Sequence, residues 1–342
     1  MRSLGWGLAA AAAVASGAAW AAAPAPRTVV SAPAVIAGAA QDGGRIAWFS
    51  RCTGVRVREL SSGRDLVTGE RRTGPCEFPV NAFVLGAGRV LWISTSPGNN
   101  TYSQVTSAVP GEPHARDHGL VIGTTLVNAG DYLAGAAGSG SLLVYSVLTR
   151  STSDGCLNPE ETSEPCEYGV SGRVIRIVGR KGVRVPGVPP AAHLAAGAGR
   201  IAIVTVAPLA PRDVLDQTGV EVRNGFSGRL VTRVAPTGEV EKLALSGTVL
   251  ALLVREGGVL SLERYGLPTG RRLGSIRVPG NATNLSVAGA RVVFRTGSAI
   301  RLLDAASGRT RVVARSPSPL SVSIVGRRVI WVEGRRVLAV AV

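Results

Sequence analysis

Few side chains in this protein could carry chemistry. It has three histidines, and two of them, His114 and His118, flank Asp117. Because four residues separate these two histidines, they could act as a base or ligand pair if they share one face of a strand. We expect the third, His193, to make a structural hydrogen bond. The sequence has no G-x-S-x-G, H-E-x-x-H or P-loop motif, the local signatures of hydrolases, zinc metalloproteases and nucleotide-binding proteins. We therefore predict no catalytic residue, no metal ligand and no cofactor.

An acidic loop is the most distinctive segment and lies between residues 150 and 169. Its carboxylates are Asp154, Glu160, Glu161, Glu164 and Glu167. Carboxylates on a constrained loop could contact a basic partner or bind a cation such as Ca²⁺, although simple solvation is their ordinary state. The spacing of an EF-hand is absent, so we do not expect a metal. These five residues form our candidate partner-binding set.

Four cysteines occur, at Cys52, Cys76, Cys156 and Cys166. An even number of cysteines in an exported chain predicts two disulfides. The spacing favours local pairing, Cys52 with Cys76 and Cys156 with Cys166, so that each bridge would staple a long loop. We do not expect zinc, because the gaps are not CxxC-like.

The chain is strongly basic, with 38 Lys and Arg against 22 Asp and Glu and a formal net charge of +16. Only Lys181 and Lys242 are lysine. Arginine can neutralise phosphates in a planar fork, and a concentration of arginine can therefore mark a polyanion-binding protein. Here the arginines are scattered along the chain without a run, which favours a solvated surface. A polyanion-binding face remains the alternative, and we do not expect nucleic acid as a partner.

The first 23 residues have the pattern of a secretory signal peptide. Arg2 precedes an apolar stretch, and small residues follow around Ala21. We predict cleavage after about Ala21 or Ala22. An uncleaved membrane anchor is the alternative, since residues 4–23 could just span a bilayer. No later stretch is apolar enough to cross a membrane, so residues 24–342 should form an exported protein, secreted or held at the cell envelope.

A repeated unit organises the rest of the chain and must position these residues. A short apolar strand leads through a tight turn with glycine into a second apolar strand. The second strands start near Arg45, Arg89, Arg200, Arg291 and Arg328, with weaker copies near Ser141 and Thr248. A third strand with alternating polar residues follows, and then a Ser/Thr-Gly-Arg turn, whose glycine we expect to adopt a positive φ. These intervals bracket the length of a four-stranded propeller blade.

The pattern predicts an all-β, seven-bladed β-propeller that occupies residues 24–342 as a single domain. Six or eight blades would follow if one weak copy is misread. The last unit has room for only three strands, so we expect residues 27–31 to supply its fourth strand and close the ring.

Aromatic residues recur at one position of the repeat, three residues after the arginine. They are Trp48, Trp92, Phe294 and Trp331. A repeated aromatic could form a sugar-stacking ladder, but equivalent positions favour a different use. We expect these rings to fill the gaps between neighbouring blades.

The repeat, with turns such as Asp304-Ala305-Ala306-Ser307-Gly308-Arg309, resembles the bacterial secreted propellers grouped with quinoprotein-like and WD40-like repeat proteins. This resemblance covers nearly all of residues 27–342 and implies the fold, because propellers host binding proteins and enzymes alike.

We predict a binding scaffold that recognises a protein or an extracellular polymer through the disulfide-stapled loops of one face, including residues 206–219. The alternatives are a hydrolase or lyase acting at the channel mouth and an electrostatic binder of polyanions. We expect a monomer.

Overall fold

The computed structural model describes residues 24–50, 54–68, 79–96, 100–124, 129–152, 167–211, 215–304 and 308–342. In these residues every element is a β-strand, all pairings are antiparallel, and no helix occurs. The predicted signal peptide and the four cysteines lie outside the described residues. So do Asp154, Glu160, Glu161 and Glu164, whereas Glu167 is described by its backbone alone.

The strands follow one another in units of four, which we number along the chain. Unit 1 is β2 (Ile36–Asp42), β3 (Arg45–Ser50), β4 (Val55–Glu59) and β5 (Asp65–Thr68); unit 2 is β6 (Val80–Gly86), β7 (Arg89–Ser96), β8 (Asn100–Ala108) and β9 (Arg116–Thr124). Unit 3 is β10 (Ala129–Ser139), β11 (Leu142–Thr152), β12 (Glu167–Val178) and β13 (Lys181–Arg184); unit 4 is β14 (Ala191–Gly197), β15 (Arg200–Val206), β17 (Gln217–Asn224) and β18 (Leu230–Val234). Unit 5 is β19 (Glu239–Leu245), β20 (Val249–Glu256), β21 (Val259–Gly266) and β22 (Arg271–Arg277); unit 6 is β23 (Ala282–Ala288), β24 (Arg291–Thr296), β25 (Ala299–Leu303) and β26 (Thr310–Arg315). Unit 7 is β27 (Leu320–Val325), β28 (Arg328–Glu333) and β29 (Arg336–Ala341), to which β1 (Arg27–Ser31) is added by pairing with β29.

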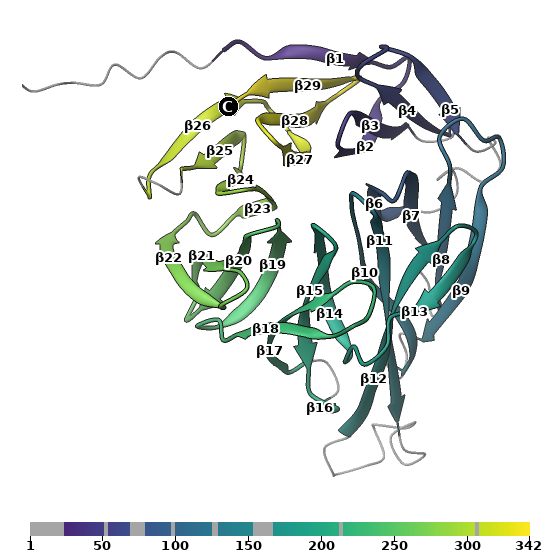
Figure 1. Ribbon diagram of the computed structural model, residues 1–342, viewed down its shortest axis with the longest axis vertical. Coiled ribbons are helices and arrows are strands. Elements are labelled where there is room, and N and C mark those ends of the chain that lie inside the picture. Colours follow the sequence, from purple (N-terminus) through teal and green to yellow (C-terminus); the bar gives the residue numbers. More distant parts are fainter. Residues whose placement is uncertain are drawn as a thin grey trace, which may run out of the picture.

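The sheets stand side by side around a centre, with the first strand of each unit innermost (Figure 1). Neighbouring innermost strands contact one another in the order β2, β6, β10, β14, β19, β23 and β27, and β27 contacts β2. Units 2 and 3 belong to one sheet, because the end of β9 pairs with the start of β10 at Gly123 and Gly130. The predicted all-β, repeated and propeller-like architecture is therefore confirmed.

The core lies between the units. The second strands are almost wholly buried, since a neighbouring unit covers each of their faces. Trp48 packs against Ile330 and Val332 of unit 7, and Trp92 packs in a cluster with Ala47 of unit 1. The prediction that the repeated aromatic residues fill the gaps between units is confirmed, because all four rings are buried in such clusters.

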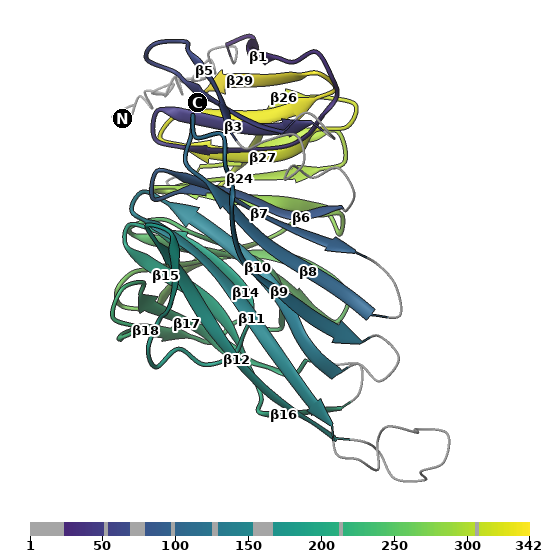
Figure 2. The ribbon, with the colours of Figure 1, turned by 90° about the vertical axis from the view of Figure 1, so that its right-hand side faces the viewer.

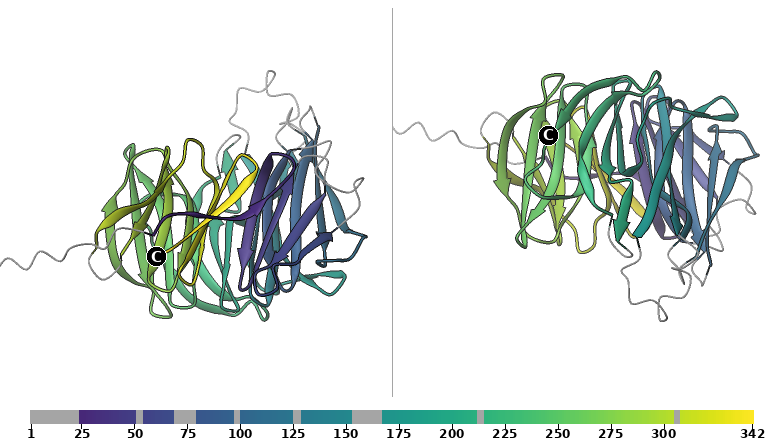
Figure 3. Two further views of the ribbon diagram at one scale, coloured as in Figure 1. Left: turned by 90° about the horizontal axis from the view of Figure 1, so that it is seen from above. Right: turned by 90° about the horizontal axis from the view of Figure 1, so that it is seen from below.

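The strands run between two faces of the ring (Figure 3). The first-to-second and third-to-fourth hairpins lie at one end of every unit, and we call this end the turn face. The first-to-second hairpins of neighbouring units are in contact there. The amide of Ala87 in unit 2 donates to the carbonyl of Gly140 in unit 3 at 2.6 Å, and Arg200 Nη1 in unit 4 donates to the carbonyl of Gly247 in unit 5 at 3.0 Å. The second-to-third hairpins and the connections between units lie at the other end, the loop face.

Turn-face hairpins are tight, as the sequence predicts. Gly63, Gly270 and Gly308 have φ angles of 69°, 70° and 65°, the left-handed conformation that glycine adopts without strain. In contrast, the acidic loop predicted between residues 150 and 169 is shorter than expected. Strand pairing continues as far as Thr152 opposite Tyr168, because alternating side chains of β11 and β12 still pack on a neighbouring unit at this height.

Candidate functional site

The loop face is uneven, because the strands of units 2 and 3 extend beyond those of the other units. Strands β8 and β9 have 9 residues each, β10 and β11 have 11, and β12 has 12. By comparison, β4 and β5 of unit 1 have 5 and 4. Figure 2 shows these long strands projecting past the rest of the ring. At about 3.3 Å per residue, β12 alone is about 40 Å long. The projecting strands form a wall along one side of the loop face.

The wall is braced from within. Thr149 Oγ1 donates to Asp131 Oδ1 at 2.5 Å, and Arg173 lies 3.4 Å from the other carboxylate oxygen, which ties β10, β11 and β12 together. On the side that faces unit 4, the short strand β16 (Leu209–Pro211) pairs with the start of β12. Since β16 lies in the segment 206–219 that we predicted to join the recognition surface, the structure brings this segment beside the base of the acidic loop.

The β8–β9 ribbon of the wall exposes apolar side chains. Tyr102, Leu120 and Ile122 are 41%, 55% and 49% exposed, and Tyr102 lies directly opposite Ile122 in the pairing register. They share the face toward unit 1, while Val105 and Val121 on the other face are buried against unit 3. Beyond Gly123 and Thr124, which pair with β10, the outer edge of β9 has no strand partner in the described part of the chain. An exposed apolar edge strand of this kind is a surface on which another polypeptide can pack.

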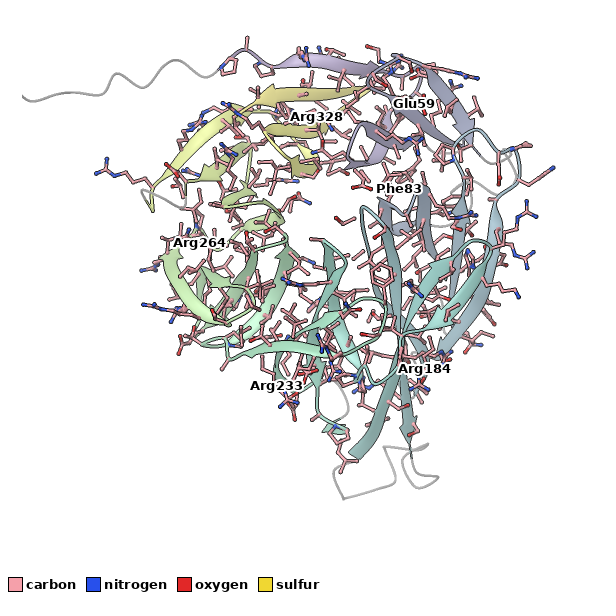
Figure 4. All side chains as sticks on the ribbon, in the orientation of Figure 1. Glu59, Phe83, Arg184, Arg233, Arg264 and Arg328 are labelled. Atoms are coloured by element: carbon pink, nitrogen blue, oxygen red, sulfur yellow. The ribbon has the colours of Figure 1, made fainter. Side chains whose placement is uncertain are left out.

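The centre of the ring holds a cavity of about 570 Å³. Its lining consists of the innermost strands, mainly of Ala, Gly, Leu, Val and Ser, and Phe83 stands at its edge (Figure 4). Each of these strands carries a β-bulge on the loop-face side of the cavity, and the bulge residues Asn284 and Ser321 have φ angles of 53° and 51°. Ser321 Oγ accepts a hydrogen bond from the amide of Ala39 at 3.0 Å. The bulges thus link neighbouring units rather than presenting reactive groups.

The histidines do not form a pair. His118 lies in β9, whereas His114 lies in the preceding turn, so the two do not share a strand face. His118 Nε2 lies 2.7 Å from Ser107 Oγ, which also accepts from Arg89 at 3.3 Å. Burial, and then the charges of Arg89 and Arg116, lower the pKa of His118, so the ring is neutral at pH 7. Although this geometry resembles a nucleophile and base, Ser107 is fully buried and cannot meet a substrate.

His193 is half-buried and lies in β14. Burial lowers its pKa, and the charge of Lys242 on unit 5 lowers it further. It does not line the central cavity. The expected structural role therefore fits its position between units 4 and 5.

Two buried carboxylates were not identified from the sequence. Glu221 and Glu263 occupy equivalent positions in the third strands of units 4 and 5, opposite Ile203 and Leu252. Glu221 accepts from Arg223 at 2.6 Å and from Arg233 at 2.9 Å. The signal in the sequence was a carboxylate at the same repeat position of consecutive units.

Glu263 has no exposed surface and accepts from three side chains. Tyr265, Thr237 and Arg272 donate to it at 2.6, 2.9 and 2.7 Å. Burial raises the pKa of Tyr265, and the bond to Glu263 raises it further, so the phenol keeps its proton. Every oxygen of Glu263 has a donor, and no solvent reaches it. This network ties β21 and β22 of unit 5 to the connection from unit 4, and Glu263 has no access to a substrate.

Within the part of the chain that the structure describes, no group of three or more His, Cys, Asp or Glu could hold a metal ion. The same residues contain no helix that is long and apolar enough to cross a membrane.

No protein-family model matches the chain, and no curated protein matches it. Solved structures match at low identity. The computationally designed Ika8 protein has a TM-score of 0.48 and 12% identity, with 92% of this chain and 99% of that chain covered. BamB from Moraxella catarrhalis has a TM-score of 0.42 and 10% identity, with 90% and 83% covered. AztD from Citrobacter koseri has a TM-score of 0.45 and 12% identity, with 85% and 74% covered.

Proposed function

We propose that this protein is an exported, seven-bladed β-propeller that serves as a binding scaffold and holds a partner protein on its loop face. The blade count rests on the seven innermost strands that surround the central cavity. Pairing of β1 with β29 supports closure of the ring by strands from both ends of the domain, because it completes the four-stranded sheet of unit 7. Export rests on the signal-peptide pattern of residues 1–23.

The observation that carries the proposal is the wall of units 2 and 3. Propeller units of equal height give a flat ring, but here the long strands project beside the short strands of unit 1. The free edge of β9 and the exposed Tyr102, Leu120 and Ile122 line this step. A partner that packs on them removes apolar area from water, worth about 25 cal/mol per Å².

The acidic loop adds charge to the same face. Asp154, Glu160, Glu161, Glu164 and Glu167 connect or begin strands of the wall, so in our proposal the partner presents both apolar and basic side chains. The disulfides Cys52–Cys76 and Cys156–Cys166 belong to this proposal, since each would limit the freedom of a loop-face connection and lower the entropy cost of binding.

The test is an affinity capture from envelope and secretome extracts, followed by binding measurements with the purified partner. Three forms of residues 24–342 are compared: the native sequence, a form with residues 153–166 replaced by a short Gly-Ser turn, and Ile122→Lys. Leu273→Lys is the matched control, because Leu273 is 51% exposed and also lies in the outermost strand of its unit.

We expect Ile122→Lys and the loop replacement each to weaken binding by about tenfold or more, as truncation at the centre of an interface does. Leu273→Lys should leave the affinity within about twofold of native. A partner that binds all four forms equally would refute the proposal that the wall is the recognition surface.

A further inference from the structure

The fold separates the charges that are scattered along the sequence. Arginine follows glycine at hairpin after hairpin, and all of these hairpins except Gly334-Arg335 lie on the turn face. The cations placed there are Arg45, Arg64, Arg89, Arg180, Lys181, Arg200, Arg229, Arg271, Arg272, Arg291, Arg309, Arg327 and Arg328. By their place in the sequence, most of the 22 carboxylates belong to the loop-face connections or to the strand ends beside them. The net positive charge of the protein is thus concentrated on one face of the ring.

Several of the turn-face cations remain available for a ligand. Arg64, Arg180, Arg229, Arg271 and Arg291 are exposed, and none forms an ion pair with another described residue. A surface charge without a partner raises the local concentration of oppositely charged ligands.

Three carboxylates near these hairpins are already engaged, and Glu112, Asp117 and Asp304 are the others at this end. Asp65 receives a forked pair of bonds from Arg58, and Glu59 lies 3.2 Å from Arg45. Both carboxylate oxygens of Asp42 accept from the amide of Gly140 at 3.0 Å. These three therefore do not compensate the exposed arginines.

Apolar side chains stand among these cations at the hairpins of units 3 and 4. Phe226 is 42% exposed and lies 4.8 Å from the guanidinium carbon of Arg176. Val183 lies directly opposite Arg176 in the register of β12 and β13, and both Val183 and Val178 are exposed. An aromatic ring and two valines surrounded by arginine and lysine match the boundary between lipid headgroups and acyl chains.

The amino-terminal end of the described chain also lies on this face. Residues 24–27 run beside Arg327 and Arg328, which line the same surface pocket with Pro24 and Arg27. The apolar stretch 4–23 precedes Pro24 in the sequence. The chain thus enters the domain at its most basic face.

We propose that the turn face docks on a bilayer that contains anionic lipid, and that the loop face points away from it. Anionic headgroups would lie against the ring of arginines, while Phe226, Val178 and Val183 would reach the interfacial layer. A soluble polyanion would be attracted by the same charges, but it would gain little from exposed apolar side chains. The acidic loop 153–166 reinforces this orientation, because an anionic surface repels it.

The experiment is sedimentation of residues 24–342 with large unilamellar vesicles of phosphatidylcholine, with or without phosphatidylglycerol. The test variant carries Arg64, Arg180, Arg229 and Arg271 each changed to Gln. The control carries Lys242, Arg277, Arg315 and Arg335 changed to Gln. These are exposed cations away from the turn-face hairpins: Lys242 lies in the middle of β19, and the other three lie at the loop-face end of their units, so net charge falls equally in both variants. Circular dichroism verifies that both remain folded.

We expect binding only to the anionic vesicles. The turn-face variant should lose about 10²- to 10³-fold in partition coefficient and the control should stay within about threefold, since each cation near the surface contributes about 1 kcal/mol. Phe226→Ser separates the two anionic ligands: it should weaken vesicle binding several-fold and leave binding to soluble polyphosphate unchanged. Equal losses for both quadruple variants would overturn the assignment of the face. Binding to polyphosphate without binding to vesicles would overturn the assignment of the membrane.

Discussion

Glu263→Gln tests whether the buried carboxylate of unit 5 stabilises the fold, as its surroundings indicate. The substitution keeps the shape of the side chain and removes its charge. Hydrogen bonds to a charged group contribute about 1.5–3 kcal/mol each. Arg272 and Thr237 are exposed and regain water when their bonds to Glu263 weaken, whereas the buried hydroxyl of Tyr265 then keeps only its longer contact of 3.3 Å with the carbonyl of Ala235. We therefore expect the free energy of unfolding to fall by about 2 kcal/mol.

Tyr265→Phe removes the donor of the same bond and should lower the free energy of unfolding by about 1 kcal/mol. Because both substitutions break one interaction, the double variant should lose about 1 kcal/mol less than the two single losses together. Urea unfolding followed by circular dichroism measures all three, with Glu256→Gln as the control at an exposed glutamate. A neutral Glu263→Gln, or strictly additive losses, would refute the stabilising role of the network.

Three further predictions concern the fold. Hydrogen bonds from Arg223 and Arg233 lower the pKa of Glu221 by more than burial raises it. The ionised carboxylate of Glu221 therefore stabilises the fold above its unfolded pKa of about 4.3, and this stabilisation is lost as the pH falls through the folded pKa. The difference in the free energy of unfolding between the native protein and Glu221→Gln, measured by urea unfolding, should close between about pH 5 and pH 2. A difference that stays constant with pH would contradict this. Gly228→Ala should prevent folding or lower the free energy of unfolding by several kcal/mol, because a Cβ there would lie 1.7 Å from the carbonyl oxygen of Pro186. Gly63→Ala has a similar φ and open space around it, so it should lower the free energy of unfolding by only about 1 kcal/mol. Thermal unfolding compares the two variants, and equal losses would show that the backbone moves to relieve the contact with Pro186. Deleting residues 24–31 should lower the unfolding temperature and cause aggregation, because it uncovers the edge of β29 and the core residues on which Val30 packs. Deleting residues 24–26 should have neither effect. Light scattering on heating distinguishes the outcomes.

Much of the fold follows from the repeat. The apolar strands and glycine turns predict β1 at residues 27–31 with the bounds that the structure has. The repeated aromatic residues identify the faces between units, since only a position equivalent in every unit recurs with that spacing. These features are local in sequence, and local patterns are enough to predict them.

The rest depends on contacts between distant residues. Gly38 and Gly135 look like strand ends in the sequence, but β2 and β10 continue past them, because a glycine inside a strand also permits a bulge. The repeat pattern does not predict the height of the wall either, because β10 begins at Ala129 and β11 continues to Thr152, beyond the apolar residues that the repeat identifies near Ser141. The segregation of charge was also missed: arginines spaced tens of residues apart gather on one face only when alternate hairpins are placed at the same end of the ring.

The proposal that the loop face binds a partner protein is tested most directly by site-specific photo-crosslinking. A photoreactive residue is placed at position 122 on the wall, at position 273 on the outer strand of unit 5, or at position 229 on the turn face, and the products from an envelope extract are identified by mass spectrometry. Our account predicts one protein crosslinked from position 122 and absent from the products of positions 273 and 229. The same protein crosslinked from position 229 and not from position 122 would contradict it.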